Sequence, residues 1–326
     1  MNIILPQNLH EGTISHIIRQ INDADGLDSE IVVDFSYLSF VYPIGALVLA
    51  QYLKYNQEQK GRTIKFVGIS FFSRAVGYLD SVGFFKYFGE CPFGVKDLNK
   101  GKSYIPFSVI EWNILQSRVN DEKLNGNIIR IQDAIEEYSE NYSDWMFGKV
   151  EPVISYCFRE IIRNVFEHTG CLYCSIFGQI YPLKDEIEIC IADSGTGIRN
   201  SLAQCYEECT SDDWALQNAI LPGITSGDVK TGSKYDNSGF GLYVLSRIAQ
   251  KFGYMLIGSG EKFLRIDSSG NTLFDGFYPG TFVGINFKYR SLLRHQEMIM
   301  QIINDGESLS RKLGINGTAS TSTKTI

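Results

Sequence analysis

The feature that most constrains the fold is an amphipathic helix pattern that carries a carboxylate and an amide one turn apart. Its apolar residues recur at helical spacing: Ile154, Cys157, Phe158, Ile161, Ile162 and Val165. Glu160 and Asn164 share the opposite face with Glu167 and His168. Asn is a mediocre residue inside a helix, because its amide competes with the backbone for hydrogen bonds. Here it can meet the same ligand as Glu160; a solvated polar stripe is the alternative interpretation.

Two glycine-rich turns follow this helix in the sequence. Isoleucine alternates with polar residues from Glu186 to Ala192, which predicts a half-buried strand that leads into Asp193. Asp193 opens the turn Ser194-Gly195-Thr196-Gly197, where glycine permits backbone conformations closed to other residues. Gly239-Phe240-Gly241-Leu242 opens a further helix, and the free N–H groups of such a helix start suit an anion. Each turn alone is weak evidence; the three pieces in this order are much stronger.

This order resembles the GHKL superfamily of ATPases, which includes DNA gyrase B subunits, heat-shock chaperones, MutL, histidine kinases and anti-sigma-factor kinases. The resemblance covers about residues 148–290. Glu160 and Asn164 are similar to the N box, and the run through His168 is closest to that of the anti-sigma-factor kinases. The segment Asp193–Gly197 is similar to the adenine-binding G1 box, and Gly239–Leu242 to the G2 box.

The resemblance implies a role for each residue. Asn164 would hold Mg²⁺, Glu160 would act as the general base, and Asp193 would accept from the adenine amino group. Thr281, which follows Gly280, is placed like the threonine that supports this aspartate. The interval 198–238 corresponds to the ATP lid. The remaining nucleotide-binding residues would be Gly195, Gly197, Gly239, Phe240, Gly241 and Leu242.

The N-terminal region predicts a separate α/β layer. Strands are expected at Ile31–Phe35 and Thr63–Val67, and helices at Ile44–Tyr55 and Arg74–Tyr87. This alternation implies a parallel strand pair, and it resembles a STAS domain, the fold of anti-anti-sigma factors. The phosphorylatable turn of that family reads Tyr42-Pro43-Ile44-Gly45 here, without the acceptor serine. We therefore expect a surface that docks a protein partner rather than a phosphoacceptor.

The expected fold is an α/β protein in four parts. Residues 1–95 would form the STAS-like domain, 96–147 a linker and helical connection, 148–290 a GHKL α/β sandwich, and 291–326 a C-terminal helix with a disordered tail. The sandwich would have a mixed, largely antiparallel sheet covered by helices. Further expected elements are strands at Ile105–Ile110, Tyr254–Ile257, Phe263–Ile266 and Phe282–Phe287, a hairpin turn at 268–271, and helices at Asn127–Tyr138 and Leu292–Leu313.

Composition is ordinary for a soluble globular chain of 326 residues. The net charge of −7 argues against a general nucleic-acid-binding surface. Since we find neither an apolar run of transmembrane length nor a basic signal-peptide start, we expect a cytoplasmic location and no membrane contact. The cysteines number seven, an odd count that favours reduced thiols over a disulfide framework.

Three functions remain open for the GHKL-like region. The first is a Mg²⁺-dependent, ATP-hydrolysing regulatory protein whose lid closure signals to a partner or to a second copy in a homodimer. The second is a Ser/Thr protein kinase of the anti-sigma-factor type, which would use Glu160 on the hydroxyl of a partner. The third is a non-catalytic, nucleotide-sensing scaffold. We favour the first, because binding alone would not require a base at position 160.

Overall fold

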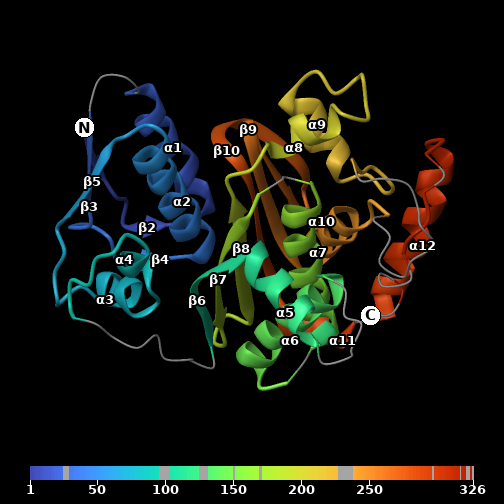
Figure 1. Ribbon diagram of the computed structural model, residues 1–326, viewed down its shortest axis with the longest axis horizontal. Coiled ribbons are helices and arrows are strands. Elements are labelled where there is room, and N and C mark those ends of the chain that lie inside the picture. The colour runs from blue at the N-terminus through green and yellow to red at the C-terminus, as the bar shows by residue number, and fades with distance from the viewer. Residues whose placement is uncertain are drawn as a thin grey trace.

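The computed structural model describes residues 1–24, 29–94, 103–124, 131–149, 151–168, 171–226, 238–295, 297–315, 317–320 and 324. Figure 1 shows mixed α/β layers: a small parallel sheet, a pair of helices, a five-stranded sheet, and helices on the far side of that sheet. Throughout these described ranges, none of the helices is both long enough and apolar enough to cross a membrane.

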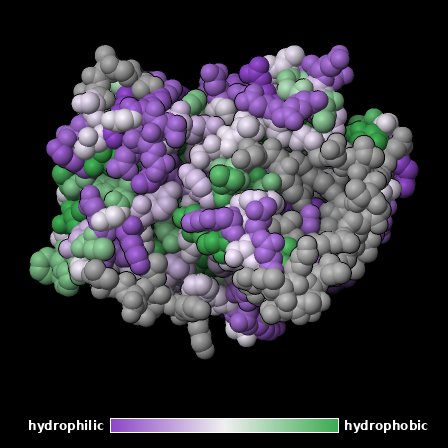
Figure 2. Space-filling view, in the orientation of Figure 1, coloured by the Kyte–Doolittle hydropathy of each residue, from purple (hydrophilic) through white to green (hydrophobic). Residues whose placement is uncertain are grey.

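The N-terminal layer is built on three parallel strands in the order β1-β3-β5, which confirms the expected parallel pair. The strands are β1 (Asn2–Ile4), β3 (Glu30–Asp34) and β5 (Thr63–Val67), with a short parallel pair β2 (Asn8–Leu9) and β4 (Phe40–Val41). The helices are α1 (Glu11–Asp23), α2 (Pro43–Gln59), α3 (Arg74–Ser81) and α4 (Phe84–Tyr87). Strand β1 and helix α1 were not predicted from the sequence. The outer face of α1 is hydrophilic (Figure 2), and its buried residues are isoleucines.

One predicted helix of this layer is broken in two. A continuous helix over Arg74–Tyr87 was expected, but α3 ends at Ser81 and α4 begins at Phe84. Gly83 separates them with φ of 92°, a left-handed conformation that a right-handed helix cannot contain. The break turns Phe84 and Phe85 into the core of the layer, where both side chains are fully buried.

The central sheet has the strand order β6-β7-β8-β10-β9. Its strands are β6 (Tyr104–Glu111), β7 (Tyr173–Tyr181), β8 (Glu186–Asp193), β9 (Gly253–Asp267) and β10 (Gly270–Lys288). All four pairings are antiparallel, where a mixed sheet was expected. Strand β6 forms one edge, so part of the segment 96–147 is a member of the sheet rather than a linker.

The last two strands form one long hairpin. Separate strands were expected at Tyr254–Ile257 and Phe263–Ile266, but both belong to the continuous strand β9. Pairing with β10 is maintained across the gap because two register shifts between Asp275 and Thr281 absorb the irregularity. The turn at residues 268–269 lies where the sequence predicted the hairpin connection.

Helices cover the far face of the sheet in Figure 1, with α7 and α10 against the strands and α12 against α10. Their bounds are α5 (Trp112–Leu124), α6 (Ile131–Phe147), α7 (Pro152–His168), α8 (Gly197–Leu202), α9 (Asp212–Ala219), α10 (Gly241–Phe252), α11 (Tyr289–Arg294) and α12 (Glu297–Lys312). The helix expected at Asn127–Tyr138 corresponds to α6, which continues to Phe147, and residues 127–130 lie outside the described residues. The helix expected at Leu292–Leu313 is interrupted near His295.

Part of the C-terminal tail that was expected to be disordered is packed. The N–H of Gly317 donates to Ser310 Oγ at 2.8 Å, and the N–H of Ala319 donates to Glu307 Oε1 at 3.0 Å. Ala319 and Ser320 are buried. The segment 317–320 therefore folds back along α12.

Both faces of the central sheet are buried. On β8, Ile187, Ile189 and Ile191 pack toward α7 and α10, whereas Cys190 and Ala192 pack toward the N-terminal layer. The prediction of a half-buried strand was therefore wrong, because α1 and α2 cover the face that would otherwise meet solvent. Burial raises the pKa of the Cys190 thiol well above its usual range.

A buried carboxylate joins the N-terminal layer to the sheet. Glu188 is 0% exposed, and its Oε1 accepts from the backbone N–H of Ile44 at 2.9 Å, in the first turn of α2. Its Oε2 accepts from Tyr254 Oη at 3.0 Å and from Asn286 Nδ2 at 3.1 Å. Burial raises the pKa of Glu188 to about 7, while these hydrogen bonds act in the opposite direction. We call this boundary, with Glu188 at its centre, the seam.

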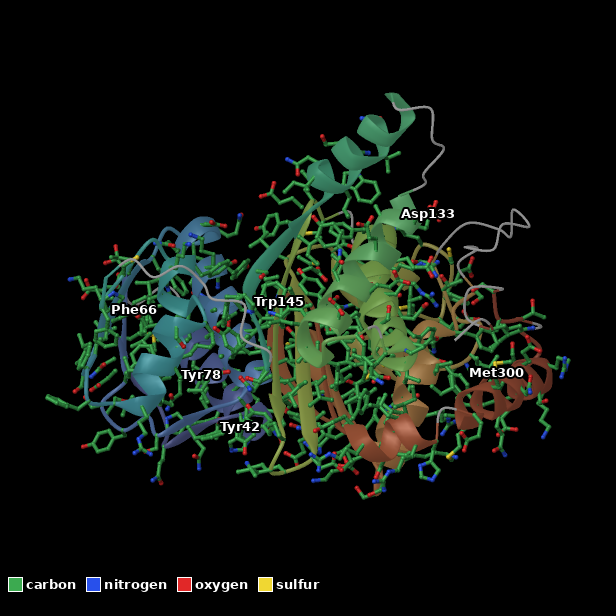
Figure 3. The ribbon with its side chains drawn as sticks, turned by 90° about the horizontal axis from the view of Figure 1, so that it is seen from below. Tyr42, Phe66, Tyr78, Asp133, Trp145 and Met300 are labelled. Carbon is green, nitrogen blue, oxygen red and sulfur yellow. The ribbon has the colours of Figure 1, made fainter. Side chains whose placement is uncertain are left out.

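The rim of the seam is closed by aromatic residues. Lys184 Nζ lies 5.1 Å, 5.2 Å and 5.6 Å from the ring centroids of Phe40, Tyr42 and Tyr181, and it donates to Tyr42 Oη at 2.9 Å. Tyr42 and Tyr78 lie on the side of the N-terminal layer that faces the sheet (Figure 3). The N-terminal layer therefore docks on the sheet of its own chain through the α1–α2 side.

Candidate functional site

The predicted site residues converge on one cavity between α7, the end of β8, α8 and the start of α10. The cavity measures about 90 Å³. Those that line it are Glu160, Asn164, Asp193, Gly197, Gly239, Phe240, Gly241, Leu242 and Thr281. Gly195 does not line the cavity, and its N–H instead donates to Asp193 Oδ1 at 2.7 Å. Three stretches far apart in the sequence thus meet at one place.

Asp193 lines the cavity, and one of its carboxylate oxygens is unsatisfied by the described part of the chain. It is 1% exposed, and its buried Oδ2 has no hydrogen-bond partner among the described residues. Burial raises the pKa of Asp193 to about 7, and the backbone N–H groups of Gly195 and Thr281 oppose the shift. Because a buried polar atom without a partner destabilises the fold by about 1–3 kcal/mol, Oδ2 is suited to a ligand that donates a hydrogen bond.

The end of β8 is fixed by the neighbouring strands. Thr281 pairs with Asp193 in the β8–β10 register, and a Cβ at Gly280 would collide with the Asp193 carbonyl. Ser259 Oγ accepts from the N–H of Ile198 at 2.9 Å and donates to the Gly280 carbonyl at 2.9 Å. Thr281 Oγ1 is buried and, like Asp193 Oδ2, has no partner in the described part of the chain.

Gly197 confirms the prediction of an unusual backbone in the first glycine-rich turn. It begins α8 with φ of 78°, and a Cβ there would lie 2.9 Å from Ser259 Oγ. A side chain at this position would be strained and would press on the serine that holds α8. Sequence analysis missed Ser259, because its role depends on the pairing of β9 with β10.

The first turn of α10 forms the opposite wall of the cavity. Gly239 has φ of 66°, and a Cβ there would lie 2.6 Å from the carbonyl oxygen of Ile224. A Cβ at Gly241 would lie 2.6 Å from Glu160 Oε2, so the Glu160 carboxylate lies against the helix start. Phe240 is fully buried behind this turn, beside Gly306 of α12 and Gly317. The packed C-terminal segment thus supports the wall from behind.

Helix α7 places Glu160 and Asn164 on the cavity, as its periodicity predicted. Glu160 is buried, which excludes the alternative of a solvated polar stripe at that position. The buried Asn164 Nδ2 has no partner within the described residues. His168 and Glu167 share this predicted face, but their side chains lie outside the described part of the structure.

Two arginines that the sequence analysis did not single out surround the Glu160 carboxylate. Arg159 Nε lies 3.3 Å and Arg163 Nη1 lies 3.7 Å from Glu160 Oε1. Both arginines are buried, and Arg163 lines the cavity. Charged residues beside a polar stripe are usually solvated, so the sequence pattern contained no signal of their burial.

The predicted lid is described only in part. Residues 197–226 contain α8 and α9, which pack together around Leu202 and Ala215. Ser201 Oγ lies 2.6 Å from Ser226 Oγ and connects α8 to the cavity wall. The remainder of the predicted lid, residues 227–237, lies outside the described residues.

The polar residues of the cavity fit a Mg²⁺ ion that is bound jointly by the protein and by the phosphates of a ligand. Among the described residues, no three His, Cys, Asp or Glu side chains gather to hold a metal ion. Mg²⁺ commonly keeps several waters and is held by one or two protein oxygens together with substrate phosphates. Asn164 lines the cavity, and its side-chain amide oxygen can supply one such ligand.

Comparison of this chain with protein-family models, with curated proteins and with solved structures finds no match.

Proposed function

We propose that this chain is a Mg²⁺-dependent, ATP-binding and ATP-hydrolysing regulatory protein of the GHKL type. One observation carries the proposal. Three buried polar atoms without partners in the described residues, Asn164 Nδ2, Asp193 Oδ2 and Thr281 Oγ1, belong to residues that line the same cavity. Such atoms are rare in native proteins, and together they imply a polar ligand.

The proposed nucleotide pose follows from the polarity of the two walls. Asp193 Oδ2 would accept from the exocyclic amino group of adenine, where guanine carries a carbonyl oxygen instead. The phosphates would extend toward the N–H groups and positive dipole at the start of α10. Bound Mg²⁺ would neutralise phosphate charge beside Asn164.

In the proposed reaction, Glu160 orients the attacking water and accepts its proton. The water oxygen forms a bond to the γ-phosphorus, and the bond from that phosphorus to the β–γ bridging oxygen breaks. The products are ADP and inorganic phosphate. Strand β8 and the seam offer a route from the cavity to the N-terminal layer, which would present the signal to a protein partner or to a second copy of the chain.

A second candidate function is a nucleotide-sensing scaffold without turnover. The observation that favours it is the engagement of Glu160 Oε1 by Arg159 and Arg163, because a carboxylate oxygen held in two ion pairs is less available to orient an attacking water. The kinase alternative receives no comparable support, because the turn at Tyr42 lacks the acceptor serine.

Calorimetry with ATP and GTP tests the binding proposal. We expect the wild-type protein to prefer ATP, and Asp193→Asn to lose about tenfold to hundredfold in ATP affinity, because an acceptor oxygen is replaced by an amide. Equal affinity for ATP and GTP, unchanged in Asp193→Asn, would sink the assignment of the cavity to adenine.

Phosphate release separates hydrolysis from sensing. Glu160→Ala should bind ATP and lower turnover by about 10²–10⁴-fold, the usual contribution of a general base. Asn164→Ala should lose Mg²⁺-dependent affinity as well as rate, because a metal ligand acts in both the ground state and the transition state. Turnover of Glu160→Ala at the wild-type rate would refute the role of Glu160 as the base, and nucleotide binding without phosphate release in the wild-type protein would favour the scaffold.

A further inference from the structure

The Glu160 carboxylate lies between two cationic groups and the positive end of a helix. Its Oε1 lies 3.3 Å from Arg159 Nε and 3.7 Å from Arg163 Nη1. Its Oε2 lies beside the backbone of Gly241, at the start of α10. Two guanidinium groups and a helix N-terminus together stabilise an anion at this position. In this structure the anion is the side chain of the protein itself.

The two arginines differ in their position relative to the cavity. Arg159 Nη1 pairs with Glu136 Oε1 of α6 at 3.2 Å, and its guanidinium lies 5.2 Å from the ring centroid of Tyr156. Arg159 is thus tied to the helix layer behind α7 and does not line the cavity. Arg163 lines the cavity, next to the proposed metal ligand Asn164.

We propose that Arg163 distinguishes ATP from ADP by exchanging its contact with Glu160 for a contact with the γ-phosphate. The inference rests on the proposed function and assigns to Arg163 a specificity role within the same site. A guanidinium binds phosphate oxygens through two parallel hydrogen bonds of about 2.7–2.9 Å. The Arg163–Glu160 pair at 3.7 Å is longer than such a bond, so a phosphate in reach is the stronger partner.

With ADP bound, this exchange would not occur, and the contacts of Glu160 would stay as they are in this structure. ADP has no third phosphate to reach the space between Arg163 and α10, so Glu160 keeps both arginine contacts. With ATP, Glu160 keeps Arg159 and is released from Arg163. One side of the carboxylate then becomes available to the attacking water, which couples recognition of the third phosphate to activation of the base.

The test compares affinities of ATP, a non-hydrolysable ATP analogue and ADP, each with Mg²⁺, in the full chain. Arg163→Gln should lose about tenfold to hundredfold in affinity for ATP and the analogue, the value of one charge-assisted contact. Its affinity for ADP should change by less than about threefold. Arg163→Lys, which keeps the charge but not the paired geometry, should show a smaller loss confined to the triphosphates.

Arg159→Gln is the matched control, because it removes a buried arginine from the same carboxylate without removing a cavity-lining group. Its ratio of ATP affinity to ADP affinity should equal that of the wild type. An equal loss for ATP and ADP in both Arg163 variants, or the same change of ratio in Arg159→Gln, would refute the assignment of Arg163 and leave the proposed function standing. Failure of the wild-type protein to bind either nucleotide would instead refute the proposed function and this inference with it.

Discussion

Strand β8 carries a buried carboxylate on each of its two faces, and the two groups have different surroundings. Glu188 faces the N-terminal layer, and both of its oxygens accept hydrogen bonds, from Ile44, Tyr254 and Asn286. Asp193 faces the cavity, and its Oδ2 has no partner in the described residues. Burial raises the pKa of each to about 7. The two carboxylates are thus equally buried, but both oxygens of Glu188 accept hydrogen bonds, whereas Asp193 Oδ2 accepts none from the described residues.

The difference in hydrogen-bond partners distinguishes a structural carboxylate from a carboxylate that is available to bind a ligand. The hydrogen bonds of Glu188 join α2 to the sheet, so the group contributes to stability through its three partners. An unsatisfied oxygen such as Asp193 Oδ2 reduces the stability of the folded protein, by about 1–3 kcal/mol. A position that weakens the fold is most simply explained by a function, which agrees with the proposed adenine contact.

The largest expected loss of stability follows from a substitution that breaks the seam. Glu188→Ala leaves two buried donors and one partly buried donor without this acceptor, and it should lower the free energy of unfolding by about 3–5 kcal/mol. Asp193→Ala should lower the free energy of unfolding by less, about 1–2 kcal/mol, because the loss of the bond from the Gly195 N–H is partly offset by removal of the unsatisfied Oδ2. Urea denaturation of both variants measures the contrast. Similar losses of stability in the two would show that the carboxylates are equivalent.

A smaller effect should appear with pH. The pKa of Glu188 is raised from 4.5 to about 7 in the folded state, so the native protein holds a proton that the unfolded chain releases. Stability from this group is fully present below about pH 4.5 and is lost as pH rises through about 7. Between about pH 5 and about pH 8, wild type should therefore lose about 1–3 kcal/mol more stability than Glu188→Gln, as urea denaturation would measure. Parallel pH profiles for the two proteins would contradict this.

The smallest effect concerns the rim of the seam. Lys184→Gln removes the ammonium from the rings of Phe40, Tyr42 and Tyr181, and should lower the free energy of unfolding by about 0.5–1 kcal/mol. Lys184 is exposed, so its loss does not uncover buried donors. Thermal denaturation compares it with Glu188→Gln. If Lys184→Gln destabilised the protein more, the rim rather than the buried carboxylate would hold the layers together.

Local patterns were sufficient to predict many of the elements. The strands β3 and β5 and the helix α2 follow from short-range periodicity, and the N-terminal layer confirms them. The break at Gly83 was not predicted, because the residues on either side both favour a helix and only the backbone angle of the glycine separates them. The burial of Glu188 was not predictable from its neighbours, because the group that covers it is 144 positions away in the sequence.

The candidate site shows the same division between local and long-range information. Glu160, Asn164, Asp193 and the glycine-rich turns were identified because their chemistry is visible in short motifs. Arg163 was missed, since an arginine beside a glutamate on a helix is usually a surface residue. The segment 317–320 was expected to be disordered from its composition, yet Gly317 packs behind Phe240. Composition carries no information about which helix a tail returns to.

The opposite orientation of Glu188 and Asp193 restricts which insertions and deletions this strand can tolerate. Successive side chains of a strand alternate between faces, so two residues on opposite faces must lie an odd number of positions apart. Insertion or deletion of a single codon between them would turn one carboxylate to the wrong side of the sheet. The turn at 182–185 lies outside this interval, so a change in its length would leave Glu188 and Asp193 on opposite faces. In relatives of this chain we therefore expect no single-residue insertion or deletion between positions 188 and 193.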